Sequence, residues 1–139
     1  KGIQIYYQKY KDSNATTNDF KSIMEEVSGQ NLTVFFQQWL YKPGALELSG
    51  NWKYDYKEQQ VLITLNQAQT DGSLFEMPIE LGINFKGEQH QQIERIQVKE
   101  KSTVFKIKVE AEPENIILDP NSWVLMRTDF KKRISSSPL

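Results

Sequence analysis

The first part of the chain, as far as Gly44, carries apolar residues at the spacing of an α-helix. Three stripes share the offsets i, i+3, i+4 and i+7, and the third continues to i+8: Ile3, Tyr6, Tyr7 and Tyr10; Phe20, Ile23, Met24 and Val27; and Leu32, Phe35, Phe36, Trp39 and Leu40. A stripe of this kind is typical of a helix that buries one face. The spacing therefore predicts three short helices, at about 2–12, 17–28 and 32–41.

The residues around these stripes agree with the predicted helix ends. Thr16 stands three residues before Asp19, as in a capping box, where each side chain binds the backbone N–H of the other residue. Gly29 suits the left-handed position just after a helix, and Asn31 is a suitable N-cap for the next one. The Pro-Gly pair at 43–44 ends the helical pattern.

Beyond Gly44 the apolar period changes to two residues. The longest alternation puts an apolar residue at every odd position from 75 to 85: Phe75, Met77, Ile79, Leu81, Ile83 and Phe85. Because successive side chains of a strand point to opposite faces, this pattern predicts a strand with one buried face. Pro78 falls on the polar face and has no N–H to donate, so we expect this strand to lie at a sheet edge or to carry a bulge there.

Shorter alternations predict the other strands. Two of them run through Trp52, Tyr54 and Tyr56 and through Val61, Ile63 and Leu65. Further strands are expected at about 92–99, 103–110, 115–119 and 123–126, and about seven short strands predict an antiparallel β-sandwich. Helices followed by strands indicate the α+β class, with a helical segment at 1–44 and a sandwich domain at 45–128. We expect the basic and serine-rich end, 129–139, to be a frayed tail.

The composition argues against an autonomous enzyme and against a nucleic-acid binder. The chain has 139 residues, with 17 Lys and Arg against 18 Asp and Glu, one histidine and no cysteine. A net charge of −1 lacks the positive field that a phosphate backbone requires. One histidine is too few for a histidine metal centre, and the lack of cysteine removes thiol nucleophiles and Cys-type zinc sites. No apolar run approaches the roughly 18 residues of a membrane span.

Three groups of residues allow a chemical interpretation, and each has a simpler structural one. His90 lies in a polar stretch between strands, where an exposed turn histidine is the preferred interpretation. Glu25 and Glu26 are adjacent carboxylates, but neighbouring helix residues project in different directions, so we expect them on the solvated side. Asp119 and Asn121 offer oxygen ligands to a hard cation such as calcium, although Asp-Pro-Asn is first of all a turn.

The aromatic alternation Trp52, Tyr54 and Tyr56 also allows two interpretations. On one strand face these rings would form a platform on which a sugar stacks. The same alternation is what the core of a β-sandwich requires, and aromatic residues favour strands. We prefer the core interpretation, and we predict no catalytic, cofactor-binding or metal-binding residue in this chain.

Several strings of the sequence resemble the aminopeptidase N family of zinc metallopeptidases. The specific ones lie in the first part: NATTNDF at 14–20, MEEVSGQNL at 24–32 and FFQQWLYKPG at 35–44. The looser ones lie in the second: WKYD at 52–55, LNQAQ at 65–69, PIE at 78–80 and LDPNSWVL at 118–125. The resemblance implies the end of a thermolysin-like catalytic domain followed by an immunoglobulin-like β-sandwich.

The resemblance also implies where the chemistry of such an enzyme lies. The parent would hold one zinc ion with a His-Glu-x-x-His helix and a distant Glu, and a Gly-x-Met-Glu-Asn strand would hold the free amine of the substrate. None of these motifs is present, and Met24 and the two glutamates after it lack the flanking Gly and Asn. In the family the catalytic tyrosine precedes this segment, so Tyr6, Tyr7 and Tyr10 do not inherit its role.

We therefore expect an inactive, non-catalytic C-terminal portion of a zinc aminopeptidase, a hydrolase that removes N-terminal amino acids from peptides. Its expected partner is the upstream catalytic domain of the same polypeptide, which it would support, and zinc is expected in the parent only. The exposed face of the helices is expected to mark the missing interface or to drive self-association. The alternative is an independent β-sandwich binding module, for instance for carbohydrate, with a helical lead-in.

Overall fold

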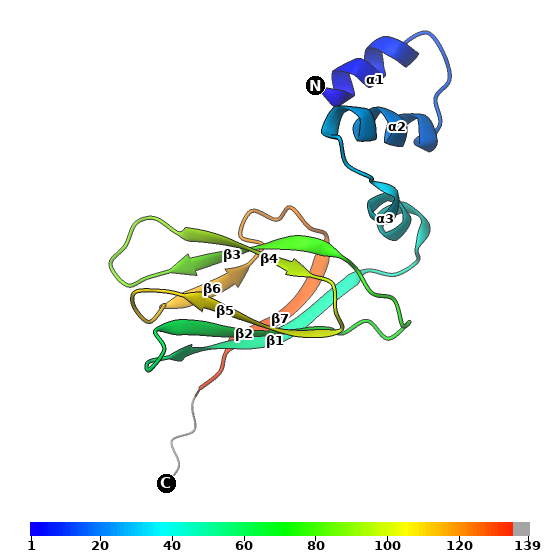
Figure 1. Cartoon of the computed structure of the whole chain (residues 1–139). Helices are drawn as coiled ribbons and strands as arrows, with labels where there is room; N and C mark the ends of the chain where they lie inside the picture. The colour runs from blue at the N-terminus through cyan, green and yellow to red at the C-terminus, as the bar shows by residue number, and fades with distance from the viewer. Residues whose placement is uncertain (135–139) are drawn as a thin grey trace. The chain divides into compact units, whose positions relative to one another are not determined.

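The structure is a computed structural model that describes residues 1–134. It consists of two compact units, a helical unit from Lys1 to Pro43 and a sandwich unit that begins at Gly44. Figure 1 shows the helices α1 to α3 in the first unit and the strands β1 to β7 in the second. Each unit is described by itself below.

The helical unit contains the three predicted helices. α1 spans Gly2–Tyr10, α2 spans Thr17–Ser28, and α3, Thr33–Phe36, continues directly into a π-helical turn, η1, Gln37–Tyr41. Two boundaries differ from the prediction: α1 ends at Tyr10, and the third helix is α-helical for only four residues before it widens.

The predicted ends of α2 are confirmed in detail. The Thr16 hydroxyl accepts the N–H of Asp19 at 3.2 Å, and the Asp19 carboxylate accepts the N–H of Thr16 at 2.8 Å. Gly29 follows the helix with a φ of 68°, a conformation that disfavours other residues. The N-cap of α3 is Leu32 and not the predicted Asn31, but Asn31 accepts the N–H of Thr33 at 2.9 Å, which satisfies one of the unpaired donors at the start of α3.

The two long helices pack through a line of residues that keeps Tyr6 and Tyr10 of the predicted stripe and adds Gly2. Gly2 is buried, and a side chain there would come within 2.7 Å of the Met24 sulfur. Tyr6 meets the ring of Phe20 edge to face at 5.0 Å. Glycine at the closest approach lets α1 come near α2, so the inward line runs Gly2, Tyr6 and Tyr10. Ile3 and Tyr7, which the stripe predicts to be inward, are left exposed.

The sandwich unit has seven strands in two sheets, as the predicted α+β fold requires. They are β1 Leu46–Asp55, β2 Gln60–Gln67, β3 Met77–Asn84, β4 Gln92–Val98, β5 Ser102–Lys108, β6 Asn115–Leu118 and β7 Met126–Lys132. The sheet orders are β5-β2-β1-β7 and β4-β3-β6. All pairs are antiparallel except β1 and β7, which run parallel.

The core lies between the two sheets, and its positions follow the predicted period of two. In β3 and just before it, Phe75, Met77, Ile79, Leu81 and Ile83 are all buried. β2 contributes Val61, Ile63 and Leu65 from the facing sheet, and β1 contributes Leu46, Leu48 and Trp52. Strand alternation alone was therefore sufficient to identify the buried face.

The expectation of an edge strand or a bulge at Pro78 is wrong for β3 as a whole, which is central in its sheet and pairs with β4 in continuous register. Pro78 itself nevertheless has a strand partner on one side only. The reason that Pro78 is tolerated is the shortness of β6, which pairs with β3 only from Leu81 to Asn84. Residues two apart on a strand direct their backbone polar groups to the same side. The carbonyl of Glu80 points to the β6 side, where it accepts the N–H of Asp119 beyond the end of β6 at 2.7 Å. Pro78, two residues earlier, would direct an N–H to the same side, where it has no strand partner, so the lack of an N–H costs no ladder hydrogen bond.

The expected frayed tail is also wrong for its first part. The strand expected at 123–126 begins only at its last residue: β7 runs from Met126 to Lys132 alongside β1, with Leu46 opposite Met126 and Trp52 opposite Lys132. The sequence MRTDFKK has no clear alternation, because most side chains of this edge strand are exposed and backbone pairing holds it. The rest of the predicted tail, 135–139, lies outside the described residues.

Candidate interaction surface of the helical unit

The helical unit contains an apolar groove of about 490 Å³. Aromatic and aliphatic side chains of α1, α2, α3 and η1 form most of its lining: Tyr6, Phe20, Phe35, Phe36, Trp39 and Leu40. Phe36, which is only 5% exposed, contacts Phe20 at 6.1 Å and Phe35 at 5.6 Å between ring centroids. Edge-to-face rings of this kind hold each other in place, so the groove is a formed surface and not a loose collection of side chains.

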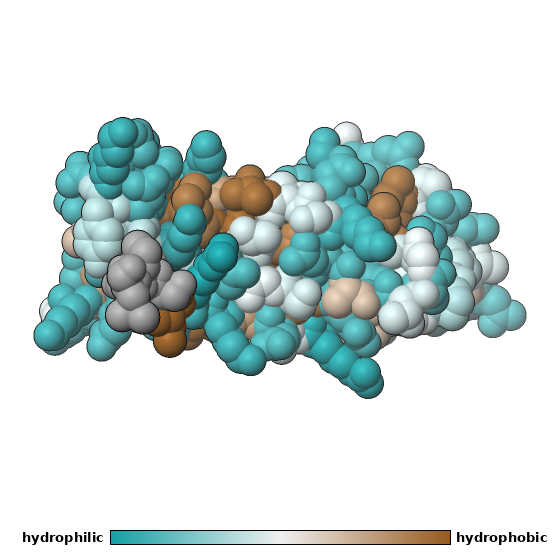
Figure 2. All heavy atoms as spheres, turned by 90° about the horizontal axis from the view of Figure 1, so that it is seen from below, coloured by the Kyte–Doolittle hydropathy of each residue, from teal (hydrophilic) through white to brown (hydrophobic). Residues whose placement is uncertain are grey.

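Exposed apolar side chains within and beyond the groove add to this surface. Six large ones on the helices are more than half exposed: Ile3, Tyr7, Val34, Phe35, Leu40 and Tyr41. Single exposed apolar residues are normal, but a contiguous group marks an interaction site. The face drawn in Figure 2, seen from below, is mainly hydrophilic with scattered apolar patches; the helical surface carries the six large apolar side chains named above. The chemistry that this surface offers is binding through burial of apolar area.

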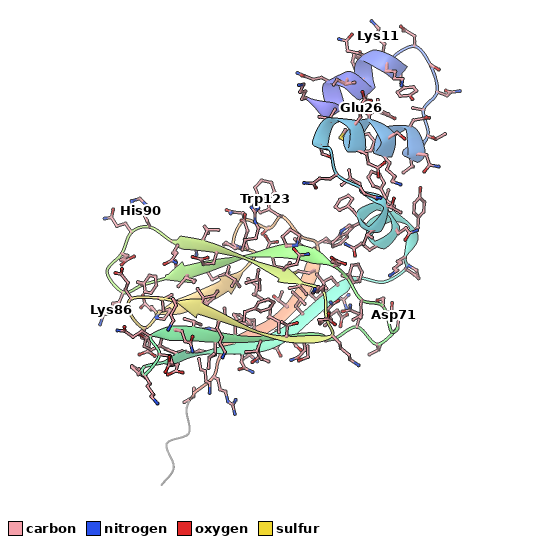
Figure 3. All side chains as sticks on the ribbon, in the orientation of Figure 1. Lys11, Glu26, Asp71, Lys86, His90 and Trp123 are labelled. Carbon is pink, nitrogen blue, oxygen red and sulfur yellow. The ribbon has the colours of Figure 1, made fainter. Side chains whose placement is uncertain are left out.

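The two adjacent glutamates of α2 have separate roles. Glu26 is exposed, as expected, and Figure 3 labels it on α2. Glu25 is half-buried, and its carboxylate accepts the N–H of Leu32 at 2.8 Å and lies 3.6 Å from the ammonium of Lys21. The expectation that both are solvated was wrong for Glu25, which ties the end of α2 to the start of α3.

The other candidates for chemistry are placed by the structure as parts of turns. His90 is exposed in the loop between β3 and β4, as predicted (Figure 3). Asp119 is 7% exposed, and its two carboxylate oxygens accept the N–H groups of Trp123 and Val124 at 3.0 and 2.7 Å. Backbone donors therefore occupy the oxygens considered for calcium. Among residues 1–134, no three His, Cys, Asp or Glu side chains are gathered as a metal ion would require.

The core interpretation of the aromatic alternation holds for only part of it. Trp52 is 1% exposed, whereas Tyr56, beyond the end of β1, is 71% exposed. The rings of Tyr54 and Tyr56 meet at 81°, which gives no continuous flat platform for a sugar. The Tyr56 hydroxyl donates to the Glu112 carboxylate, and this hydrogen bond lowers the pKa of Glu112 and raises that of Tyr56.

Sequence reasoning missed the environments of two residues, the buried Gln67 and the exposed Trp123. Gln67 is 3% exposed, and its amide binds the N–H and the carbonyl of Phe75 at 2.8 and 2.9 Å. Its inward position could have been found, because it continues the alternation of Val61, Ile63 and Leu65. Trp123, which falls in the strand expected at 123–126, is 77% exposed.

No helix within residues 1–134 is long and apolar enough to cross a membrane.

Comparison with known proteins shows that the chain is similar to part of several aminopeptidases. No protein-family model matches. Aminopeptidase M1-D of Oryza sativa subsp. japonica is 27% identical over 134 residues, which are 93% of this chain and 14% of the relative. The puromycin-sensitive aminopeptidase of Caenorhabditis elegans is 23% identical over the whole chain, which spans 15% of it. Aminopeptidase N of Escherichia coli (strain K12) is 30% identical over 48% of this chain.

The fold has a counterpart among solved structures. The crystal structure of Legionella pneumophila aminopeptidase A in complex with aspartic acid superposes with a TM-score of 0.75 over 92% of this chain and 15% of that one, at 16% identity. The predicted resemblance to aminopeptidases is confirmed, and the chain spans about a seventh of the length of the relatives that it matches from end to end.

Proposed function

We propose that this chain is a non-catalytic portion of a zinc-dependent aminopeptidase. In this proposal residues 1–44 are the helical end of the catalytic domain, and residues 45–128 form an immunoglobulin-like domain that supports it. The observation that carries the proposal is the match to aminopeptidase M1-D, which runs over 93% of this chain and only 14% of that protein. A match of this kind is expected of one segment of a long polypeptide.

The helical unit supports the same proposal on physical grounds. Its long helices span nine and twelve residues, and isolated helices of this length are marginal in water. Helices gain stability mainly by burying an apolar face, yet Ile3 and Tyr7 of α1 and Leu40 of η1 are each more than half exposed. We infer that the catalytic domain of the same polypeptide covers this surface and fills the groove.

The zinc and the catalytic residues belong elsewhere in the proposed parent. His90, the single histidine of the chain, is exposed in a turn, and there is no cysteine to join it. These residues do not fit a catalytic zinc site, which needs three protein ligands around the metal. This chain would contribute support and a packing surface, and the upstream domain would contribute the metal-bound water and the amine-binding strand.

The test begins with the coding sequence upstream of Lys1. We expect it to encode His-Glu-x-x-His and a distant Glu. The longer polypeptide should release amino acids from aminoacyl-anilide substrates, a chelator should stop this release, and zinc should restore it. The 139-residue chain alone should release none. An upstream sequence without the motif, or zinc-dependent release by the chain alone, would contradict the proposal.

The exposed helical surface should make the isolated chain self-associate. Replacing Tyr7 and Leu40 together by serine should shift its sedimentation toward the monomer, because less apolar area is available for burial between copies. Val104→Ser is the matched control, since Val104 is 56% exposed on the sandwich. A monomeric wild-type chain, or an equal shift with the control, would argue against a specific surface on the helices.

A further inference from the structure

The loop between β6 and β7 holds a rigid conformation that exposes a large aromatic ring. The N–H of Asp119 donates to the carbonyl of Glu80 at 2.7 Å, and the N–H of Ser122 donates to the carbonyl of Asp119 at 3.0 Å. The buried carboxylate of Asp119 holds the N–H groups of the next turn. Asp119 and Ser122 both have a left-handed backbone, with φ of 47° and 54°. Conformations of this kind are costly for residues other than glycine and concentrate at functional sites.

The side chain that this loop presents is Trp123. It is 77% exposed and points away from the sandwich in Figure 3. The hydrogen bonds of Asp119 to the N–H of Trp123 and of the following residue fix the backbone on which the indole stands. The indole therefore stands at a fixed place on the loop, and a ligand that stacks on it has only two side-chain torsions to order.

A pocket of about 430 Å³ opens beside this ring. Its polar side is a chain of three planar side chains: Arg95 donates to one oxygen of Glu80 at 3.0 Å, and Asn121 donates to the other at 3.2 Å. The Glu80 side chain is 19% exposed and Arg95 is 69% exposed, so the carboxylate is the anchor and the guanidinium is the accessible end. Both hydrogen bonds lower the pKa of Glu80, which keeps it an acceptor.

We propose that this pocket binds a neutral carbohydrate, with one sugar ring lying on the indole of Trp123 and its hydroxyl groups toward Arg95, Glu80 and Asn121. The C–H groups of a pyranose face are suited to the electron-rich face of an indole. Sugar hydroxyl groups both donate and accept hydrogen bonds. The pocket matches them with donors on Arg95 and Asn121 and with acceptors on Glu80 and Asn121. The charges of Arg95 and Glu80 are paired, and the third charged group of the lining, the buried Asp119 carboxylate, already accepts two backbone N–H groups, so the pocket offers no unpaired charge to select an ionic ligand.

The backbone around the pocket argues against an extended peptide as the ligand. A peptide that adds a strand needs unpaired backbone groups along an edge. Here β3 pairs with β4 on one side. On the other side Pro78 has no N–H to donate, and the Glu80 carbonyl already accepts the N–H of Asp119. The proposal concerns the sandwich unit alone and does not depend on the aminopeptidase proposal.

The test is a titration of the 139-residue chain with neutral monosaccharides and disaccharides, followed by nuclear magnetic resonance. The indole N–H resonance of Trp123 should shift and saturate with one of them, with a Kd of about 1 mM for such an open site. The resonance of the buried Trp52 should stay in place. Trp123→Ala should weaken binding at least about tenfold, because it removes the stacking face.

Matched variants distinguish a sugar site from a protein contact and from a folding defect. Leu125 is 83% exposed and does not line the pocket, so Leu125→Ala should leave binding unchanged. Trp123→Phe should keep part of the affinity, and an unchanged thermal midpoint checks folding in each variant. The proposal is overturned if no sugar shifts the Trp123 resonance or if both alanine variants weaken binding equally. It is also overturned if Trp123→Ala alters only self-association, which would make the loop a protein contact.

Discussion

The two units of this chain differ in how much of their apolar surface they bury. Among the described residues, the sandwich unit holds nearly all of the buried hydrophobic side chains, and the helical unit holds only Ile23 and Phe36. Both units nevertheless form regular elements with well-made ends. Regular secondary structure is therefore not evidence that a segment is self-sufficient, because most helix stability in proteins comes from packing.

The difference follows from how the two patterns are used. In the sandwich, two sheets each turn one face inward, and their alternating residues bury one another. In the helical unit, short helices carry apolar residues on more than one side, so pairing α1 with α2 leaves Ile3 and Tyr7 outside. A surplus of apolar surface on a short element indicates that a further partner is needed.

Truncating a core residue in each unit should give the largest effects and tests the comparison directly. Leu81→Ala, in the centre of β3, should lower the free energy of unfolding by about 2–5 kcal/mol, because a closed core cannot collapse into the cavity. Ile23→Ala should fall at the low end of that range, because its partly exposed surroundings can relax. Hydrogen exchange of β2 and α2 amides reads the two units separately. Equal losses would mean that the helical unit has a closed core of its own.

Val104→Ala is the control for the loss of a branched side chain from a strand. Val104 is 56% exposed, so the change should stay within about 0.5 kcal/mol.

Removing a carboxylate that accepts backbone N–H groups should give the next largest loss in the free energy of unfolding. Asp119→Ala should cost about 1–3 kcal/mol, because it leaves two backbone N–H groups without their buried acceptor and puts alanine at a left-handed φ. Glu25→Ala removes one N–H acceptor from a half-buried place in the helical unit and should cost less than about 1 kcal/mol. Chemical denaturation measures both. A larger loss for Glu25→Ala would reverse the comparison.

Asp119→Asn separates the two causes of the loss expected for Asp119→Ala, the lost acceptors and the left-handed backbone. Asparagine tolerates a left-handed backbone and keeps one side-chain acceptor, so its cost should lie between those of the wild type and Asp119→Ala.

The sequence predicted much of this structure because its strongest signals are local. The capping box of Thr16 and Asp19 and the odd positions of 75–85 are decided by neighbours in the chain. The central position of β3 was not predictable from Pro78, because it depends on where β6 ends. The strand β7 was missed because its pairing with β1 uses backbone groups and leaves no side-chain pattern.

The sequence predicted that the helices expose an apolar surface, but it did not predict which residues form the exposed surfaces. The apolar stripes indicated an exposed helical face, but the close approach at Gly2 turns Ile3 and Tyr7 outward while Tyr6 stays packed. The exposure of Trp123 depends on the buried carboxylate of Asp119, a contact that hydrophobic patterning does not encode.

Removing a helix cap should have a smaller effect, confined to the helical unit. Thr16→Ala takes away the acceptor for the Asp19 N–H and should cost about 1 kcal/mol of helix stability. Thr16→Ser keeps a hydroxyl and should recover most of it. The amides at the start of α2 should lose hydrogen-exchange protection while those of β2 and β3 keep theirs. A loss that spreads equally to the sandwich would show that the two units unfold together.

The smallest expected effect is a pH dependence of the stability of α2, which arises from Asp19 in the capping box. The pKa of the Asp19 carboxyl is lowered, first by the backbone N–H of Thr16 and then by its hydroxyl. A group with a lowered folded-state pKa stabilises the fold above its unfolded pKa, and this contribution is lost as the pH falls through the folded value. Helix stability should therefore decline as the pH drops below the ordinary carboxyl range of about 4.

Asp19→Asn supplies the control for this titration, because its amide does not titrate. The helical circular dichroism signal of the wild type should exceed that of the variant at neutral pH, and the two should converge in acid. Other carboxyl groups titrate in both chains and cancel in the difference. If the gap between the two stayed constant with pH, the charge of Asp19 would contribute nothing to α2, and the helical unit would depend on packing alone.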